Sequence, residues 1–147
     1  MNDKDELLKL ENQLCFAFYA CSREITKLYR PILSELDLTY TQYITMLALW
    51  EKDGVTVKDL GARLLLDSGT LTPLLKKLEA MQLITRDRDK ADERNLVIRV
   101  TEHGAQLKEK AMCVPAQLSQ QMNIPIEEVN SIRDQIQDLL SKLEPTV

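Results

Sequence analysis

Apolar residues near both ends of the chain recur at helical intervals. Those between residues 18 and 36 predict a long first helix over about 5–36, which Pro31 kinks or ends early. Near the other end Pro125 opens a last helix, in which apolar side chains form a seam of the kind that favours a partner helix. The seam residues are Val129, Ile132, Ile136, Leu139 and Leu143. Both terminal helices are therefore candidates for dimer contacts.

Three helices are predicted in the middle of the chain, each preceded by a polar residue that can cap it. Thr39 begins a capping box that opens a helix over 41–51. Thr56 caps a short helix. The third begins at about 68–70, because Pro73 lacks an N–H and is tolerated only near the first turn of a helix.

After the third helix the apolar period changes from that of a helix to that of a strand. Residues 83–88 and 96–100 are predicted to form two short strands joined by a charged tip. Thr101 then caps another helix, which is expected to run past Ala111 and to meet Pro115.

This order of helices, turn and charged hairpin is typical of the winged helix-turn-helix. We therefore predict a mainly α fold with a small β wing. About 39–100 would form a DNA-reading lobe, and about 5–36 and 101–143 would form the dimerisation helices.

The composition indicates one domain over 1–147 in a cytoplasmic protein. The chain has 147 residues, of which 44% are hydrophobic, enough to bury one core, and it shows neither a signal peptide nor an apolar run that could cross a bilayer. Three cysteines are an odd number, which argues against a secreted disulfide framework. With one histidine and no phosphate-binding glycine loop, we expect no metal, no cofactor and no membrane partner.

The charge is unevenly distributed along the chain. A net charge of −4 and a pI near 5.1 argue against a generic nucleic-acid binder. Residues 58–99, however, carry nine Lys and Arg against seven Asp and Glu. The basic surplus thus coincides with the elements predicted to read DNA.

The second helix of this fold enters the major groove by its N-terminus, where small hydroxyl side chains reach base edges or phosphates. Lysines one turn further on are placed to meet phosphates, and wing arginines approach the neighbouring backbone or minor groove. Asp92 could hold Arg94 in a bidentate pair. Each feature alone is more often a cap or a solvated face, but together they favour DNA binding. The predicted DNA-binding residues are Ser68, Thr70, Thr72, Lys76, Lys77, Arg86, Arg88, Lys90, Asp92 and Arg94.

The predicted DNA-reading segments resemble those of a known family. Residues 66–79 (LDSGTLTPLLKKLE), with 92–94 (DER) in the wing and 96–104 (LVIRVTEHG) after it, resemble the MarR family of transcriptional regulators. The similarity covers about residues 10–110. It implies a winged-helix homodimer that binds a pseudo-palindromic operator in double-stranded DNA, with repression as the family default.

A narrower resemblance concerns a lone thiol near the N-terminus. Residues 13–16 (QLCF) with Tyr29, and 38–43 (LTYTQY), look like the organic-hydroperoxide-resistance regulators and their thiol-sensing relatives. This implies that Cys15 reacts with peroxide and that Tyr29 and Tyr40 hydrogen-bond to it. Fourteen residues of one continuous helix span about 21 Å, so a contact between Cys15 and Tyr29 requires the other chain of a dimer.

The expected chemistry converts the Cys15 thiolate to a sulfenic acid, with which a second thiol condenses. This condensation is expected to release the operator. Cys21 of the same chain is excluded unless the helix melts, because about 9 Å of rise exceeds the roughly 7 Å limit for a disulfide. Cys113 of the other subunit and a small cellular thiol both stay open as condensing partners. For Cys21 and Cys113, packing as buried small hydrophobes is the favoured interpretation.

Two other function classes stay open. A regulator of the same fold could answer to a small aromatic ligand between the dimer arms and the DNA-reading lobes, with Cys15 structural. A thiol peroxidase is less favoured, because Asn12 stands three residues before the cysteine where a threonine would be expected, and because the DNA-reading hairpin would have no purpose. We therefore expect a regulator and not an enzyme.

Overall fold

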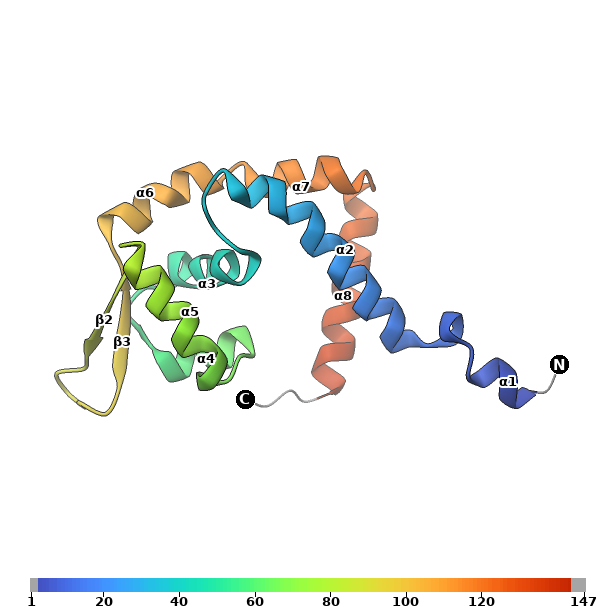
Figure 1. Ribbon diagram of the computed structural model, residues 1–147, viewed down its shortest axis with the longest axis horizontal. Coiled ribbons are helices and arrows are strands. Elements are labelled where there is room, and N and C mark those ends of the chain that lie inside the picture. Colours follow the sequence, from blue (N-terminus) through green and yellow to red (C-terminus); the bar gives the residue numbers. More distant parts are fainter. Residues whose placement is uncertain (1–2, 144–147) are drawn as a thin grey trace.

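The computed structural model describes residues 3–143, so the two ends of the expected single domain, 1–2 and 144–147, lie outside it. Its elements in chain order are α1 (Asp3–Leu7), the 3-10 turn η1 (Leu10–Asn12), α2 (Leu14–Ser34), α3 (Tyr40–Glu51), β1 (Val55–Thr56), α4 (Val57–Leu64), α5 (Ser68–Ala80), β2 (Ile84–Arg88), β3 (Leu96–Val100), α6 (Glu102–Ala111), α7 (Val114–Met122) and α8 (Ile126–Lys142). The expected fold class, mainly α with a small β wing, is confirmed. Figure 1 shows the β2–β3 hairpin at one end of the molecule and α1 at the other.

The long first helix expected over 5–36 is wrong at its N-terminal end. The chain is extended at Lys9 and again at Gln13, so that α1 and α2 are separate helices. Side-chain amides explain the break: Asn12 donates to the carbonyl of Glu6 at 2.7 Å, and Gln13 donates to the carbonyls of Leu7 and Lys9 at 2.8 and 2.7 Å. Such bonds satisfy the last carbonyls of α1 and compete with continuation of the helix.

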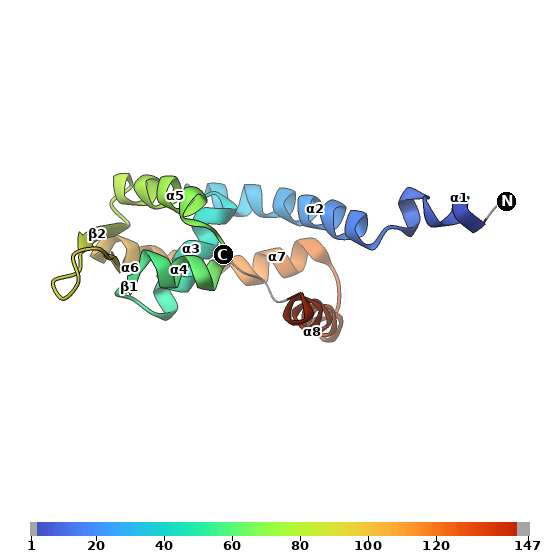
Figure 2. The same cartoon turned by 90° about the horizontal axis from the view of Figure 1, so that it is seen from below.

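Pro31 lies inside α2 and does not end it, since the helix continues to Ser34. A proline in the last turn removes only one backbone hydrogen bond near an end that frays in any case. Figure 2 shows α2 running on a single axis from the lobe toward the N-terminal segment. The distance along α2 is therefore fixed by its helical rise.

The predicted capping residues set the helix starts in the lobe. Thr39 accepts from the Gln42 N–H, and the Gln42 side chain accepts in return from the Thr39 N–H, which completes the capping box. Thr56, Asp67 and Thr101 each accept from the N–H three residues later. Each bond satisfies a donor that has no partner inside its helix.

The sheet has three antiparallel strands in the order β1-β3-β2. The two long strands pair over their whole length, with Ile84 opposite Val100 and Arg88 opposite Leu96. β1 was not predicted, because two residues are too short for an apolar period to be read. It pairs with the middle of β3 and anchors the hairpin to the helices.

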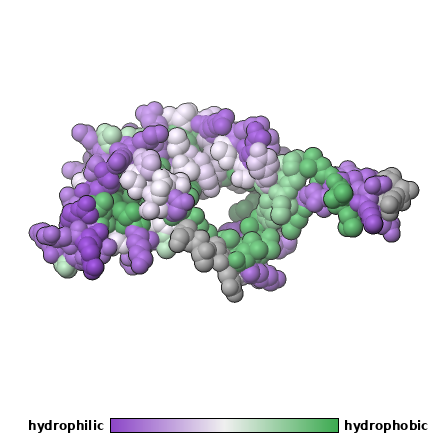
Figure 3. Space-filling view, turned by 60° about the horizontal axis from the view of Figure 1, so that its bottom comes forward, coloured by the Kyte–Doolittle hydropathy of each residue, from purple (hydrophilic) through white to green (hydrophobic). Residues whose placement is uncertain are grey.

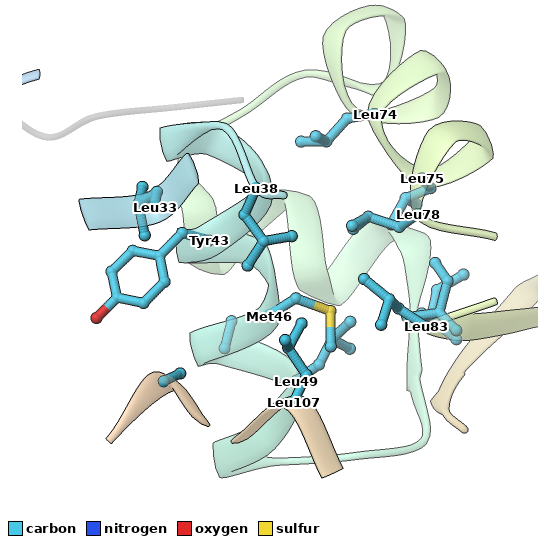
Figure 4. Packing of buried hydrophobic residues seen from close by; sticks show 14 of the residues in the cluster. Leu33, Leu38, Tyr43, Met46, Leu49, Leu74, Leu75, Leu78, Leu83 and Leu107 are labelled. Atoms are coloured by element: carbon cyan, nitrogen blue, oxygen red, sulfur yellow. The ribbon is translucent and has the colours of Figure 1, made fainter. Parts of the chain in front are cut away.

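The core of the lobe is built around α3. Met46 and Leu49 of α3 are completely buried, and they pack among buried leucines of α5 and residues of the sheet (Figure 4). Leu71, Leu74, Leu75 and Leu78 form an apolar stripe on one face of α5 and are all buried. α3 thus fixes the position of the helix predicted to enter DNA.

The C-terminal part departs from the expectation at one point. The helix after Thr101 ends at Ala111 and does not run past it, because Met112 and Cys113 turn the chain into α7, where Pro115 occupies the first turn. α7 packs along α2, and α8 follows as expected. α8 has no buried residue, and its seam residues Ile132 and Ile136 are exposed in the single chain.

Figure 3 shows hydrophobic surface where α2 and α8 leave the lobe and along the segment that leads to α1. Exposed side chains there include Leu14, Phe16 and Tyr19 of α2 and Leu140 of α8. A contiguous apolar surface of this kind marks an interaction site. The terminal helices therefore have the character expected of a dimer surface.

Gly104→Ala should destabilise the lobe. A Cβ at Gly104 would collide with the Leu83 carbonyl and approach Val100 Cγ1 to 2.8 Å, so the start of α6 would have to move off the sheet. We expect a loss of about 2 kcal/mol in the free energy of unfolding measured by urea denaturation.

Gly69→Ala is the matched control, because Gly69 is also helical and its added Cβ meets only the Asp67 side chain, at 3.3 Å. An alanine there should be neutral or gain up to about 1 kcal/mol from helix propensity. Equal stability of the two variants would contradict the close approach of α6 to the sheet.

Candidate DNA interface and cysteine site

The N-terminus of α5 presents hydroxyl side chains to solvent. Asp67 caps it by accepting from the Thr70 N–H at 2.7 Å, and this hydrogen bond holds the pKa of the Asp67 carboxyl below its usual value. Ser68 and Thr70 are exposed, and Thr72 is half-buried one turn on. The remaining N–H groups of this turn and the positive end of the helix dipole suit contact with an anion.

Lys76 and Lys77 lie on the exposed side of the same helix. The apolar stripe of α5 packs inward, so the lysines project away from the core. A lysine at such a position meets a phosphate as a point charge.

The wing holds one arginine in a fixed orientation. Arg94 donates from Nε to Asp92 Oδ1 at 3.0 Å and from Nη2 to Asp92 Oδ2 at 3.1 Å, so the predicted bidentate pair is present. The guanidinium keeps the pKa of the Asp92 carboxyl below its ordinary value. The Arg94 side chain is still 89% exposed, so its outer face is free to meet another anion.

Arg86 sits differently from the other predicted wing residues. Its side chain is only 18% exposed and donates to Glu79 of α5 at 3.0 Å. This pair ties β2 to the recognition helix, so Arg86 is placed to hold the wing against α5. Arg88 donates to the Glu93 carbonyl at 3.3 Å, and Lys90 is exposed at the hairpin tip.

A cavity of about 510 Å³ lies between α4, α5 and the hairpin. Five of the predicted DNA-binding residues line it, together with Lys58 of α4, which the sequence analysis did not single out. The signal that could have found Lys58 is its place in the first turn of the helix before the recognition helix. The five predicted residues are Ser68, Thr72, Arg86, Arg88 and Arg94.

A second group of predicted residues meets at the junction of α2 and α3. The rings of Tyr29 and Tyr40 are 4.9 Å apart between centroids, and Tyr43 joins them at 5.8 Å from Tyr29. Tyr43 was missed, although it lies one helical turn after Tyr40 and faces the same side. The structure thus brings together the two tyrosines that the resemblance paired and adds a third.

Burial, with smaller contributions from the neighbouring Tyr40 and Tyr43, raises the pKa of Tyr29 to about 12. The pKa of Tyr43 is also raised, by burial first and then by Tyr40 and Cys113. A phenol with such a pKa keeps its proton at neutral pH. Tyr29 is therefore a permanent hydrogen-bond donor for an anionic partner.

Cys15 lies at the opposite end of α2 from this cluster. It is the second residue of the helix, its side chain is exposed, and fourteen residues of uninterrupted helix put it about 21 Å from Tyr29. Within one chain the two cannot touch.

The other two cysteines are also free and exposed, so their interpretation as buried packing residues is wrong for the single chain. Cys113 caps α7, and its Sγ lies 3.3 Å from the Lys110 carbonyl and 3.5 Å from Gln117 Nε2. Its chain neighbours Met112 and Pro115 line one groove together with Tyr43, so Cys113 lies close to the tyrosine cluster.

Over the described residues 3–143, no group of three His, Cys, Asp or Glu side chains is arranged to hold a metal ion. Within the same range, no helix is long and apolar enough to cross a membrane.

Comparison with known proteins identifies the family. Residues 27–111 match the family model described as Transcriptional regulator SarA/Rot. The organic hydroperoxide resistance transcriptional regulator of Bacillus subtilis is 48% identical over 97% of both chains. This chain belongs to the SarA/Rot family of MarR-like regulators. The expected family and its organic-hydroperoxide-resistance subgroup are thus confirmed.

Two further relatives agree with this assignment. The HTH-type transcriptional regulator SarZ of Staphylococcus saprophyticus is 44% identical, over 97% of this chain and 96% of its own. Reduced AbfR bound to DNA has a TM-score of 0.77 at 36% identity, over 97% of this chain and 99% of its own. AbfR, a protein of Staphylococcus epidermidis, has also been solved overoxidized on DNA and in a disulfide form.

This member of the family is therefore a DNA-binding transcriptional regulator with a MarR-like winged helix. Double-stranded DNA and a second copy of the chain, the two macromolecular partners predicted from the sequence, are the partners of regulators of this kind. The exposed apolar faces of α2 and α8 fit the second of them.

The tyrosine cluster should make the protein sensitive to high pH. The folded-state pKa of Tyr29 is raised above its unfolded value, so the unfolded state releases the proton first as pH rises. The contribution of Tyr29 to stability is complete below pH 10 and is lost between about 10 and 12. Urea unfolding across this range should show a falling stability whose slope is reduced in Tyr29→Phe.

Absorbance titration of phenolate formation provides the second measurement. The component near pH 12 should vanish in Tyr29→Phe, and it should move toward pH 10 in wild-type protein unfolded in urea. A Tyr29→Phe titration identical to that of the wild type would rule out the packed cluster.

Proposed function

We propose that this regulator is a homodimeric, cytoplasmic repressor that senses organic hydroperoxides or related oxidants through Cys15 and leaves its operator on oxidation. One observation carries the proposal. The rings of Tyr29 and Tyr40 pack together and the raised pKa of Tyr29 keeps its proton in place, whereas the exposed Cys15 lies about 21 Å from Tyr29 on the same helix. The two halves of a thiolate site are thus present in every chain and can join only between chains.

The DNA-reading part of the proposal assigns about 39–100 to the operator and about 5–36 and 101–143 to dimerisation, as one domain. The hydroxyls at the start of α5 would reach base edges or phosphates in the major groove. Arg94, held by Asp92, would enter the neighbouring minor groove or meet its backbone. A pseudo-palindromic operator would match the two-fold axis of the dimer.

The sensing step begins with the Cys15 thiolate of one subunit beside the tyrosines of the other. Two phenol O–H donors stabilise the thiolate, which attacks the outer oxygen of a hydroperoxide. The O–O bond breaks, the alkoxide takes up a proton and leaves as the alcohol, and Cys15 becomes a sulfenic acid. Sulfur is oxidised by two electrons and the peroxide is reduced by two.

A second thiol then condenses with the sulfenic acid, forming a disulfide and releasing water. Cys113 of the partner lies beside the partner's tyrosine cluster, where Cys15 would sit, and the disulfide form of AbfR supports this route. A small thiol abundant in the reducing cytoplasm is the other candidate. Either product is larger than a thiolate and would displace the tyrosines.

Displacement at this junction would alter the distance between the two recognition helices. Half-sites one turn apart lie about 34–36 Å from centre to centre, so a small change in that distance weakens operator binding. The proposed signal is therefore geometric and leaves the DNA-contacting residues unchanged.

Cys15→Ser tests the proposal. The variant should bind operator DNA like the wild type, since Cys15 lies outside the DNA-reading lobe, but an organic hydroperoxide should no longer release it. Mobility-shift titration with and without peroxide measures both properties. Cys21→Ser is the matched control on the same helix and should release DNA normally.

Cys113→Ser distinguishes the condensing thiols. Mass analysis of the peroxide-treated wild type should show either an intersubunit disulfide that this variant lacks or a mixed disulfide that it retains.

Release of operator DNA from Cys15→Ser by peroxide would refute the sensor, and its release by an aromatic acid instead would favour a ligand-responsive regulator. Repeated peroxide turnover with a thiol reductant would favour an enzyme.

Asp92→Asn tests the wing. The change removes a negative charge from a DNA-binding surface, so electrostatics alone would strengthen binding. We expect operator affinity to fall by about three- to tenfold instead, because Arg94 loses its bidentate partner. Fluorescence anisotropy at fixed salt measures this affinity.

Asp87→Asn is the matched control, since Asp87 is an exposed wing carboxylate in β2 and the charge change is the same. It should bind with unchanged or higher affinity. Arg94→Ala should lower the salt dependence of binding by about one counterion. Tighter binding by Asp92→Asn would mean that Arg94 needs no positioning.

A further inference from the structure

An apolar groove lies on the outer side of α3, beside the tyrosine cluster. It has a volume of about 330 Å³, and Tyr43 belongs both to its wall and to the cluster. Leu47 and Met112 in this groove are exposed, Met112 by 67%. The remaining lining residues are Trp50, Glu51, Lys108, Ala111 and Pro115.

The segment before Cys15 carries a complementary surface. Leu7, Leu8, Leu10 and Leu14 are all exposed, Leu8 by 84%. These leucines lie next to Cys15 in the sequence and are exposed in the single chain. An exposed apolar group of this kind marks an interaction site, so we expect another surface to cover them.

We propose that residues 7–14 of the partner subunit fill this groove and complete the sensing site. The inference rests on the proposed function, which brings the partner's Cys15 to Tyr29 and Tyr40. Leu10 precedes Cys15 by five residues, which span at most about 17 Å when extended. The groove begins at Tyr43, whose ring is 5.8 Å from that of Tyr29, so the partner's leucines reach it.

The chain's own segment is a poor occupant. Leu14 starts α2 about 22 Å from Tyr29, and Figures 1 and 2 show the segment continuing away from the lobe. The hydrogen bonds that the side-chain amides of Asn12 and Gln13 donate to backbone carbonyls fix that exit direction. A second copy, whose α2 approaches from outside, presents the leucines to the groove directly.

The groove connects the sensor to the DNA-reading lobe. Its floor is α3, whose opposite side packs on α5. A disulfide at Cys15 would draw the attached segment out of the groove and expose the side of α3. The recognition helix would then respond to the loss of a packed neighbour as well as to the dimer angle.

Trp50 is the only tryptophan of the chain and lines the groove, so its fluorescence reports occupancy. The variant Leu8→Asn/Leu10→Asn should increase acrylamide quenching of Trp50 about twofold, because water and quencher then reach the indole. Leu65→Asn, at an exposed leucine in the lobe, is the matched control and should leave quenching unchanged. All proteins are reduced, free of DNA and shown to be dimeric by sedimentation.

Mixed dimers identify the donor of the segment. When the double variant is combined with an excess of Trp50→Phe, every tryptophan lies in a chain whose partner has an intact segment. Quenching should return to the wild-type value. Equal quenching of wild type and double variant, or quenching that stays high in the mixed dimer, overturns the proposal.

Photocrosslinking covers the case in which the double variant does not dimerise. A benzophenone at position 10 of the otherwise wild-type chain should crosslink to a peptide of the partner that contains Leu47 or Met112, and crosslinks elsewhere overturn the proposal. These readouts use no peroxide and no operator. A protected Trp50 with no Cys15-dependent release would refute the sensor alone, and the reverse result would refute the groove alone.

Discussion

The burial of α3 is the constraint on which the other parts of the molecule depend. Met46 and Leu49 have no exposed surface, and the helix is packed against α5, the sheet and α6 at once. Interiors of this density transmit a displacement, since a side chain cannot shift without moving its neighbours. Tyr40 and Tyr43 lie on the same helix and pack against Tyr29 of α2. One twelve-residue helix therefore contacts both the tyrosine cluster and the helix predicted to enter DNA.

Sequence reasoning succeeded where local physical chemistry decides the structure. The predicted caps at Thr39, Thr56 and Thr101 act over three residues, and all three are present. It failed where side chains bind unexpected backbone groups. The first helix was extended back to residue 5 from an apolar period that begins at residue 18, but the side-chain amides of Asn12 and Gln13 donate hydrogen bonds to carbonyls of Glu6, Leu7 and Lys9, which no period reveals.

The candidate site shows the same division. The Asp92–Arg94 pair spans two residues and was predicted, whereas the pairing of Arg86 with Glu79 depends on how β2 meets α5 and was not. Tyr43 joined the cluster through the packing of α2 on α3. Contacts between elements depend on the fold, and a single sequence contains them only indirectly.

An acidic chain can bind DNA because the local field matters more than the net charge. Lys58, Arg86, Arg88 and Arg94 converge on one cavity between the helices and the wing. The acidic first turn of α1 lies at the far end of the molecule, and those of α6 and α8 belong to helices outside the DNA-reading lobe. Charges separated by more than a Debye length, about 8 Å at physiological salt, are largely screened, so the acidic turn of α1 at the far end of the molecule has little effect on the basic cavity.

A covalent change at one sulfur can alter operator affinity only if it changes the free-energy difference between the DNA-binding state of the dimer and the released state. The oxygen atom that oxidation adds to the sulfur is small. A large effect on DNA binding therefore requires that the atom disturb the packing of a whole interface. The 21-residue length of α2 supplies this condition for the proposed sensor, because it prevents Cys15 from reaching the tyrosines of its own chain. In the proposed sensor, loss of the thiolate would therefore remove a contact between chains, and symmetry would repeat this loss at both ends of the dimer interface.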